Sequence, residues 1–395
     1  MADCIIPEGY KKTSLGVVPE EWEAVRIHEI CTLVNGRAYK QNELLSEGKY
    51  KILRVGNFFT NDSWYFSDLE LDANKYACKG DLLYAWSASF GPRFWTEEKV
   101  IYHYHIWKIC DLKGIDKQYL YLFLDYDASL LQNAIQGGTM HHITKNDMEK
   151  RFIPLPPMEE QRNIAKVLNT WDKAIEKQTQ LIEKLELRKK GLMQQLLTGK
   201  KRLPGFGGEW KEVKAGLLFG NSSIRSNKLE PLLSVTQDRG VVPRDMLEAR
   251  VTMPNGDLSS FKLVDVGDFV ISLRSFEGGL EYSKYRGIVS PAYTVLKKKT
   301  DLSDVFYKVY FKSNDFIQRL AVAVIGIRDG KQISYSDFCY IKIPYPSLQE
   351  QNAIANVFVS CDDEILLAKQ KLNHFQQQKK GLMQVLLTGK KRVTQ

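Results

Sequence analysis

The chain holds one short set of charged residues that could support chemistry on a phosphodiester. Asp81 is followed by Glu97, Glu98 and Lys99, a combination that imitates the metal-binding cluster of a nuclease. Carboxylates of this kind can hold Mg²⁺, and a nearby lysine can stabilise charge that develops on a phosphate. Because so short and gapped a pattern also arises by chance, a metal-dependent nuclease is kept only as an alternative.

Other catalytic patterns are absent from the sequence. His103 and His105 alternate on one strand face and could bind a metal, but the spacing places no third ligand. There is no G-x-x-x-x-G-K-[ST] phosphate loop, no G-x-S-x-G elbow and no [DN]-P-P-[YF] run. The six cysteines include no C-x-x-C pair. We therefore predict no catalytic residue, no metal site and no cofactor in this chain.

Polar and cationic side chains gather instead in the predicted loops of both halves of the chain. Arg can read the edge of guanine, Asn and Gln can read adenine, and Ser, Lys and Arg can hold phosphates. The candidates for contact with DNA are Arg37, Arg54, Asn57, Ser87, Arg93, His141 and Lys145 in the first half, and Arg225, Gln237, Arg239, Arg274, Ser275, Arg328 and Lys331 in the second. Any single one is more often a solvated loop residue, so the prediction rests on the recurrence of the set in both halves.

The elements that must position these loops belong to an internal repeat. Residues 189–202 read KKGLMQQLLTGKKR and residues 379–392 read KKGLMQVLLTGKKR, alike at thirteen of fourteen positions. Upstream, IPLPPMEEQ at 153–161 answers to IPYPSLQEQ at 343–351 with the same offset. The chain is one unit written twice.

The segments between these copies are less alike but keep the same order. Gly80-Asp81 answers to Gly267-Asp268, and an aromatic helix predicted at 116–135 answers to 305–311. Runs rich in β-branched and aromatic residues predict strands at 51–59, 81–86 and 100–107. We expect two similar mixed α/β domains with different surfaces.

Each copy also carries apolar residues at alternating steps of four and three. They predict a seam formed by Ile164, Leu168, Trp171, Ile175, Ile182, Leu185, Leu192 and Leu196 in the first copy, and by Ile354, Phe358, Ile365, Leu372, Phe375, Leu382 and Leu386 in the second. A 3.5-residue period held for about five heptads is typical of a coiled coil. We therefore predict two long helices that pack on each other.

One further match predicts how the copies are connected in space. Residues 11–22, KKTSLGVVPEEW, resemble residues 201–210, KRLPGFGGEW, which leave the first helix. The chain therefore begins at the point to which its own end would connect, as in a cyclic repeat around a pseudo-two-fold axis with antiparallel helices. The predicted segments are domain 1 at 1–155, helix 1 at 156–202, domain 2 at 203–345 and helix 2 at 346–395.

The composition is that of an ordinary soluble protein, with 44% hydrophobic and 26% charged residues. No run is apolar enough to span a membrane, so we expect a cytoplasmic protein with reduced cysteines. The net charge is +9, and most of the excess gathers near the C-terminal ends of the predicted helices. That placement agrees both with the helix dipole and with a surface for nucleic acid.

Together these motifs resemble the specificity subunit of type I restriction-modification enzymes. The resemblance rests on the two Pro-rich entries with Glu160-Gln161 and Glu350-Gln351, on the duplicated G-L-M-Q-x-L-L-T-G-K, and on the opening Y-K-K-T-S-L-G-V-V-P-E-E-W. It covers essentially the whole chain. It implies two target-recognition domains that each read one half of a split DNA site, and helices that set the spacer between the halves.

The same resemblance implies the partners of the chain. They are double-stranded DNA, modification (methyltransferase) subunits, two of which are expected, and restriction (translocase/nuclease) subunits. S-adenosylmethionine, ATP and Mg would belong to those partner subunits, and this chain would be non-catalytic. The resemblance assigns no DNA contact residue by residue. A coiled-coil adaptor that never touches DNA is the second alternative.

Overall fold

The computed structural model describes residues 6–134, 143–225, 229–247, 258–273, 275–323 and 333–393. The chain divides into two compact units: the first comprises Met1–Gln178 with Lys371–Gln395, and the second comprises Thr179–Gln370. Both long helices therefore change unit within their length, because each half-helix packs on its own globular part. Among the described residues, no helix is long and apolar enough to cross a membrane.

The first unit is built on two four-stranded sheets. Its strands are β1 (Tyr10–Thr13), β2 (Gly16–Pro19), β3 (Glu23–Arg26), β4 (Thr32–Asn35), β5 (Tyr50–Leu53), β6 (Tyr65–Ser67), β7 (Tyr76–Ala77), β8 (Leu82–Ser87), β9 (Ser89–Phe94), β10 (Val100–Tyr102), β11 (Ile106–Cys110) and β12 (Phe152–Leu155). Its shorter helices are α1 (Ile27–Ile30), α2 (Val55–Phe59), α3 (Lys117–Ala134) and α4 (Lys145–Glu149). One sheet has the order β4-β11-β8-β9 and the other β6-β5-β10-β7, in which β5 and β10 are parallel.

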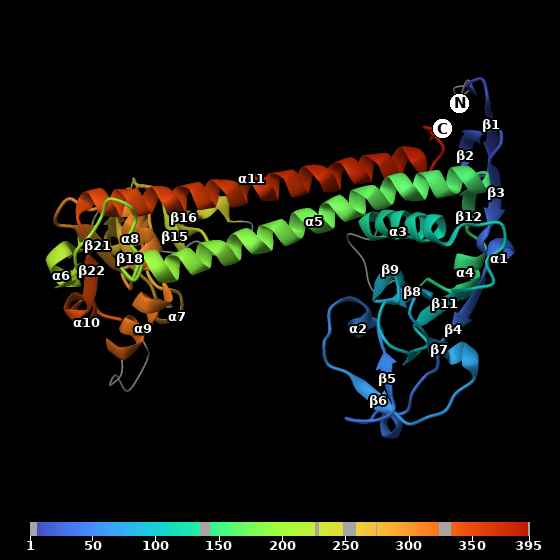
Figure 1. The fold of residues 1–395 in the computed structure, drawn as a ribbon, viewed down its shortest axis with the longest axis horizontal. Helices are drawn as coiled ribbons and strands as arrows, with labels where there is room; N and C mark the ends of the chain where they lie inside the picture. The colour runs from blue at the N-terminus through green and yellow to red at the C-terminus, as the bar shows by residue number, and fades with distance from the viewer. Residues whose placement is uncertain are drawn as a thin grey trace. The chain divides into compact units, whose positions relative to one another are not determined.

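The helix predicted at 116–135 is confirmed as α3, which runs beside α5 (Met158–Leu196) in Figure 1. The strand predicted at 51–59 is wrong in its second half, because β5 ends at Leu53 and α2 follows. Gly56 and Asn57 are poor strand formers. The helical turn places the Phe58 side chain in the core, where it has no exposed surface.

The second unit repeats the plan of the first. Its strands are β13 (Lys211–Lys214), β14 (Phe219–Ser222), β15 (Leu233–Thr236), β16 (Gly240–Pro243), β17 (Lys262–Val264), β18 (Phe269–Ile271), β19 (Glu281–Tyr282), β20 (Gly287–Val289), β21 (Thr294–Lys298) and β22 (Lys342–Tyr345). Its shorter helices are α6 (Ala215–Leu218), α7 (Ser275–Gly278), α8 (Asp304–Tyr310), α9 (Asn314–Ala323) and α10 (Tyr335–Tyr340). The sheet order β14-β21-β18-β19 corresponds to β4-β11-β8-β9, and the pair β13-β22 corresponds to β3-β12.

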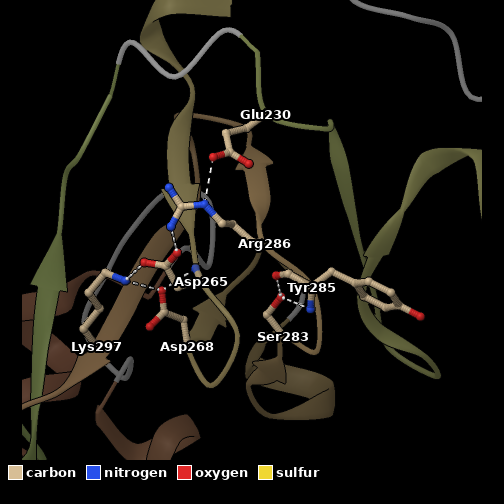
Figure 2. Close-up of polar contacts among 7 residues, drawn as sticks. All are labelled: Glu230, Asp265, Asp268, Ser283, Tyr285, Arg286 and Lys297. Atoms are coloured by element: carbon tan, nitrogen blue, oxygen red, sulfur yellow. Dashed lines mark hydrogen bonds and ion pairs between the residues drawn. The ribbon is translucent and has the colours of Figure 1, made fainter.

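A network of hydrogen bonds and ion pairs connects strands of the second unit at the turn before β18. Figure 2 shows Lys297 Nζ donating to Asp265 Oδ2 at 2.6 Å and to Asp268 Oδ2 at 2.8 Å. Asp265 also pairs with Arg286, whose Nε donates to Glu230 Oε1 at 2.7 Å. The aspartate of the repeated Gly-Asp pair therefore has a structural role in this unit.

α5 and α11 (Leu348–Leu386) run antiparallel within each unit. In the first unit, Trp171 from the early part of α5 meets Phe375 from the late part of α11, with ring centroids 5.7 Å apart. In the second unit, Lys189 from the late part of α5 forms an ion pair with Asp362 of α11. Every predicted seam residue is buried or half-buried, as the 3.5-residue period requires.

The start of the chain meets its end at a buried carboxylate in the first unit. Trp22 Nε1 donates to Glu160 Oε2 at 2.9 Å, and Arg392 donates to both oxygens of Glu160, at 3.1 and 2.8 Å. Gly389, with φ +72°, lets the chain approach closely, since a Cβ there would lie 2.4 Å from Pro19 Cδ.

The second unit contains equivalent contacts, but there the tryptophan and the arginine come from one continuous segment of the chain. Trp210 Nε1 donates to Glu350 Oε2 at 2.9 Å, and Arg202 Nη2 donates to the same oxygen at 2.6 Å. The match between the opening segment and the segment after the first helix therefore corresponds to equivalent contacts in the two units.

Candidate nucleic-acid interface

The first unit has a cavity of about 470 Å³ beside α2 that collects two of the predicted DNA contacts. Arg54 directly precedes α2 and Asn57 lies within it, so a single helical turn presents both. The residues that line the cavity include Arg54, Asn57, Trp64, Tyr65, His103 and His105. Guanidinium, amide and aromatic groups in one hollow can contact the edge and the face of a nucleobase.

Local contacts limit which hydrogen-bonding groups Arg54 and Asn57 can present to a nucleobase. The Arg54 guanidinium lies over the Tyr65 ring, 5.3 Å from its centroid. Asn57 Nδ2 donates to Asn61 O at 3.0 Å and to Ser63 O at 2.7 Å. Because both amide hydrogens hold the loop, Asn57 presents an acceptor, and a bidentate contact with adenine would require these bonds to break.

Two histidines that the sequence did not predict as DNA contacts also line this cavity. Burial lowers the pKa of His103 to about 4, and His105 and Arg54 add to the effect. His103 is therefore neutral near pH 7 and offers one N–H donor and one acceptor nitrogen. The alternation of His103 and His105 is visible in the sequence, but it suggested metal binding and not contact with a base.

Arg37 and Ser87 do not line this cavity. Arg37 donates two hydrogen bonds to Glu43, at 2.9 and 2.7 Å. Ser87 is only 5% exposed. In this conformation neither side chain is presented for direct contact with a duplex.

The remaining candidates of the first unit are not among the lining residues either. Arg93 of β9 donates to the carbonyl oxygen of Phe58, so it supports α2 from the sheet. Lys145 begins α4 and lies 3.4 Å from Glu149. His141 lies outside the described residues. The structure thus brings together Arg54 and Asn57 and places Arg93 beneath them.

The second unit has its own cavity of about 470 Å³, which collects Gln237 and Arg239. Both lie in the turn between β15 and β16. Lysines that the sequence did not predict line the same hollow: Lys189, Lys284, Lys308 and Lys312. Cationic groups in this number favour a ligand rich in acceptors, such as a phosphate or the edge of guanine.

The other candidates of the second unit do not line this hollow. Arg225 follows β14 and is exposed. Ser275 is 1% exposed, and its hydroxyl accepts a hydrogen bond from Ser272 N at 2.8 Å. Arg274, Arg328 and Lys331 lie outside the described residues.

The nuclease alternative finds no support in the structure. Asp81 Oδ2 accepts from Cys78 N at 2.8 Å and lies 2.7 Å from Lys108 Nζ, which repeats the aspartate turn of the second unit. Glu97 is exposed, and Lys99 lies over the Tyr76 ring at 3.8 Å. In the part of the chain that the structure describes, no group of three His, Cys, Asp or Glu residues could hold a metal ion.

Comparison with known proteins agrees with this architecture. Residues 19–187 match the family model of the type I restriction modification DNA specificity domain. A putative type I restriction enzyme specificity subunit of Methanocaldococcus jannaschii, MjaX, is 28% identical over 98% of this chain and 97% of its own length.

Solved structures share the fold. The S subunit of a type I restriction-modification system from M. genitalium is matched over 93% of this chain and 96% of its own, with 17% identity and a TM-score of 0.52. A chain from a structure on complex assembly and conformational transition of the type I system is matched over 94% and 98%, with 16% identity and a TM-score of 0.60. Two α/β units with equivalent sheet orders on two long helices therefore make a two-domain fold that is shared with these solved S subunits. Residues 19–187 carry the type I restriction modification DNA specificity domain, and over nearly its whole length the chain is similar to type I restriction enzyme specificity subunits.

Proposed function

We infer that this chain is the DNA sequence-recognition subunit of a type I restriction-modification complex and that each unit reads one half of a split site. One observation carries this inference. The two units share a sheet order, but different residues line their cavities. Arg54 and His103 line the first cavity, whereas Gln237 and Lys308 line the second. Two unlike readers on one scaffold suit an asymmetric bipartite site.

The long helices are proposed to set the spacing between the half-sites and to dock the modification subunits. Because the G-L-M-Q-x-L-L-T-G-K motif occurs at the end of both helices, an equivalent docking surface would occur twice, and two modification subunits would bind. S-adenosylmethionine would then act in those subunits, and ATP and Mg in the restriction subunits. Because the DNA that the complex would bind lies in the cytoplasm, we expect the chain to act there.

The test is a mobility-shift assay with the chain purified together with its modification partner. We expect a duplex that carries the genomic methylation motif to be bound more tightly than a scrambled duplex, with affinity that falls as salt increases. The coiled-coil adaptor alternative, which the known relatives do not support, predicts a stable complex with the partner and no shift of either duplex.

A further inference from the structure

The cavity of the second unit lies where β19, α8 and the β15–β16 turn meet the helix pair. Gly240 begins β16 with φ +77°, and a Cβ at this position would lie 2.6 Å from Tyr282 O. The glycine therefore lets the turn lie directly on β19, which brings Arg239 to the cavity. Met193, Leu280 and Val309 add apolar surface to the lining.

Positive charge exceeds negative charge in this cavity. Its three carboxylates are each matched by one cation, in the pairs Lys189–Asp362, Lys312–Glu281 and Arg239–Asp238. Two lysines are left over: neither Lys284 nor Lys308 has an ion pair with a carboxylate among the described residues. The hollow therefore carries two cations that no acidic side chain in it neutralises.

Lys308 is the more constrained of the two, because it is half-buried on α8. Burial lowers its pKa, and the neighbouring charges of Lys284 and Lys189 lower it further, while Asp362 acts in the opposite direction. A half-buried ammonium group among other cations is stabilised by an anion that enters the hollow.

The first unit provides an internal comparison for this position. Asp116 N donates to Gln161 Oε1 at 2.7 Å, and Ser303 N donates to Gln351 Oε1 at 2.9 Å. Since these glutamines occupy equivalent places at the start of α5 and α11, Asp116 and Ser303 mark equivalent points before α3 and α8. Residues at the same distance from these points can therefore be compared directly.

Five residues further on, the first unit has Tyr121 where the second has Lys308. Tyr121 packs on Phe94, with ring centroids 5.0 Å apart. Lys308 Nζ instead lies 5.8 Å from the centroid of the Tyr282 ring, on the strand that corresponds to that of Phe94. The fold accepts an aromatic residue here, so the lysine is a feature of the second unit and not a requirement of the architecture.

We propose that Lys284 and Lys308 hold a phosphate group in this cavity and that the backbone of the bound duplex supplies it. This inference rests on the proposed function. Two ammonium groups that converge on a hollow can donate several charge-assisted hydrogen bonds to phosphate oxygens. A contact of this kind fixes the position of a duplex but carries no sequence information, so its loss should weaken all sequences alike.

The experiment uses the full chain in complex with its modification partner and measures duplex affinity as a function of salt. The main variant is Lys308→Tyr, which installs the residue that the first unit already accommodates. A second variant, Lys284→Thr, removes an exposed side chain and keeps the test valid if the first does not fold. Lys211→Ala on β13, an exposed lysine outside the cavity lining, is the matched control.

We expect each cavity variant to bind duplexes about tenfold more weakly, with the slope of log K against log salt smaller by about 0.9 and the methylated motif unchanged. An unchanged slope would overturn the proposal, as would a change in the second half-site, which would make the cavity a base reader. If the wild-type complex binds no duplex at all, the proposed function itself fails.

The source of the phosphate is tested separately. The DNA-free complex is titrated with inorganic phosphate at constant ionic strength and followed by ³¹P NMR. Saturable binding that Lys308→Tyr removes, with duplex affinity unchanged, would support a phosphate site filled by a free ligand instead of DNA. No saturable binding together with an unchanged salt slope would overturn the proposal.

Discussion

The indole nitrogen of Trp22 donates a hydrogen bond to Glu160 across 2.9 Å, and both residues are buried although 138 positions separate them. Arg392, near the C-terminus, donates to the same carboxylate. The first unit is therefore assembled from both ends of the chain. This arrangement makes the first unit depend on the last helix for its stability.

Removal of Arg392 should destabilise the chain. Glu160 has a side chain that is 8% exposed, so Arg392→Ala leaves a buried carboxylate without its cation and should lower the free energy of unfolding by about 1–3 kcal/mol. Urea denaturation measures the loss. The control is Arg188→Ala, whose ion pair with Glu364 is about half exposed on both sides and should cost less than about 1 kcal/mol. Equal losses in the two variants would contradict the account.

Stability should fall in mild acid because of His103. Its pKa is about 4 in the folded chain, against about 6.5 in an unfolded chain. Between these values the unfolded state binds a proton that the folded state does not, so the free energy of unfolding decreases as pH falls, by up to about 1.4 kcal/mol per pH unit. His103→Asn should flatten this slope in denaturation curves from pH 7 to pH 4.5. A control substitution at exposed His374 should leave it in place.

Substitutions in the first cavity should change one half of the recognised site. Arg54→Ala removes a lining guanidinium, and Arg93→Ala removes the support that β9 gives to α2. Both should relax or alter the first half-site in methylation mapping and leave the second intact. Gln237→Ala in the second cavity is the reciprocal variant. Uniform weakening over all sequences after Arg54→Ala would show that Arg54 contacts phosphate and not a base.

Shortening of the helix pair should change the spacer. Deletion of residues 174–180 and 371–377 removes one heptad from each helix, including Phe375, the partner of Trp171. Seven residues rise about 10 Å, which corresponds to about three base pairs of duplex. Methylation mapping should show a shorter spacer between unchanged half-sites. An unchanged spacer in a folded, active complex would exclude the helices as the measuring element.

The sequence predicted those features that depend on periodicity and repetition. The seam from Ile164 to Leu196 follows from spacing alone, since any helix with a 3.5-residue apolar period must bury that stripe. The contact of Trp22 with the C-terminal end was implied by the match of two segments. By contrast, residues 55–59 were predicted as a strand because Val55, Phe58 and Phe59 favour one, but Gly56 and Asn57 do not, and a helical turn buries Phe58.

The lining of the two cavities could be predicted only in part. Arg54 and Gln237 were named as candidates from residue type and loop position, and both line a cavity. Lys308 was not, because it lies in an apolar helical run, and its significance depends on a comparison with Tyr121 that requires the fold. Ser87 was predicted as a contact and is buried, because β8 lies between β11 and β9 and is buried on both faces from Leu82 to Ala85.

The most direct test of the central claim is a map of methylated adenines in a genome whose cell expresses this chain with its partner subunits. We predict a single bipartite motif, with two different half-sites, a fixed spacer and a methylated base in each half. Exchange of the second globular segment, residues 203–345, for that of another specificity subunit should replace one half-site and keep the other. A continuous motif, or a change of both half-sites after this exchange, would contradict the account.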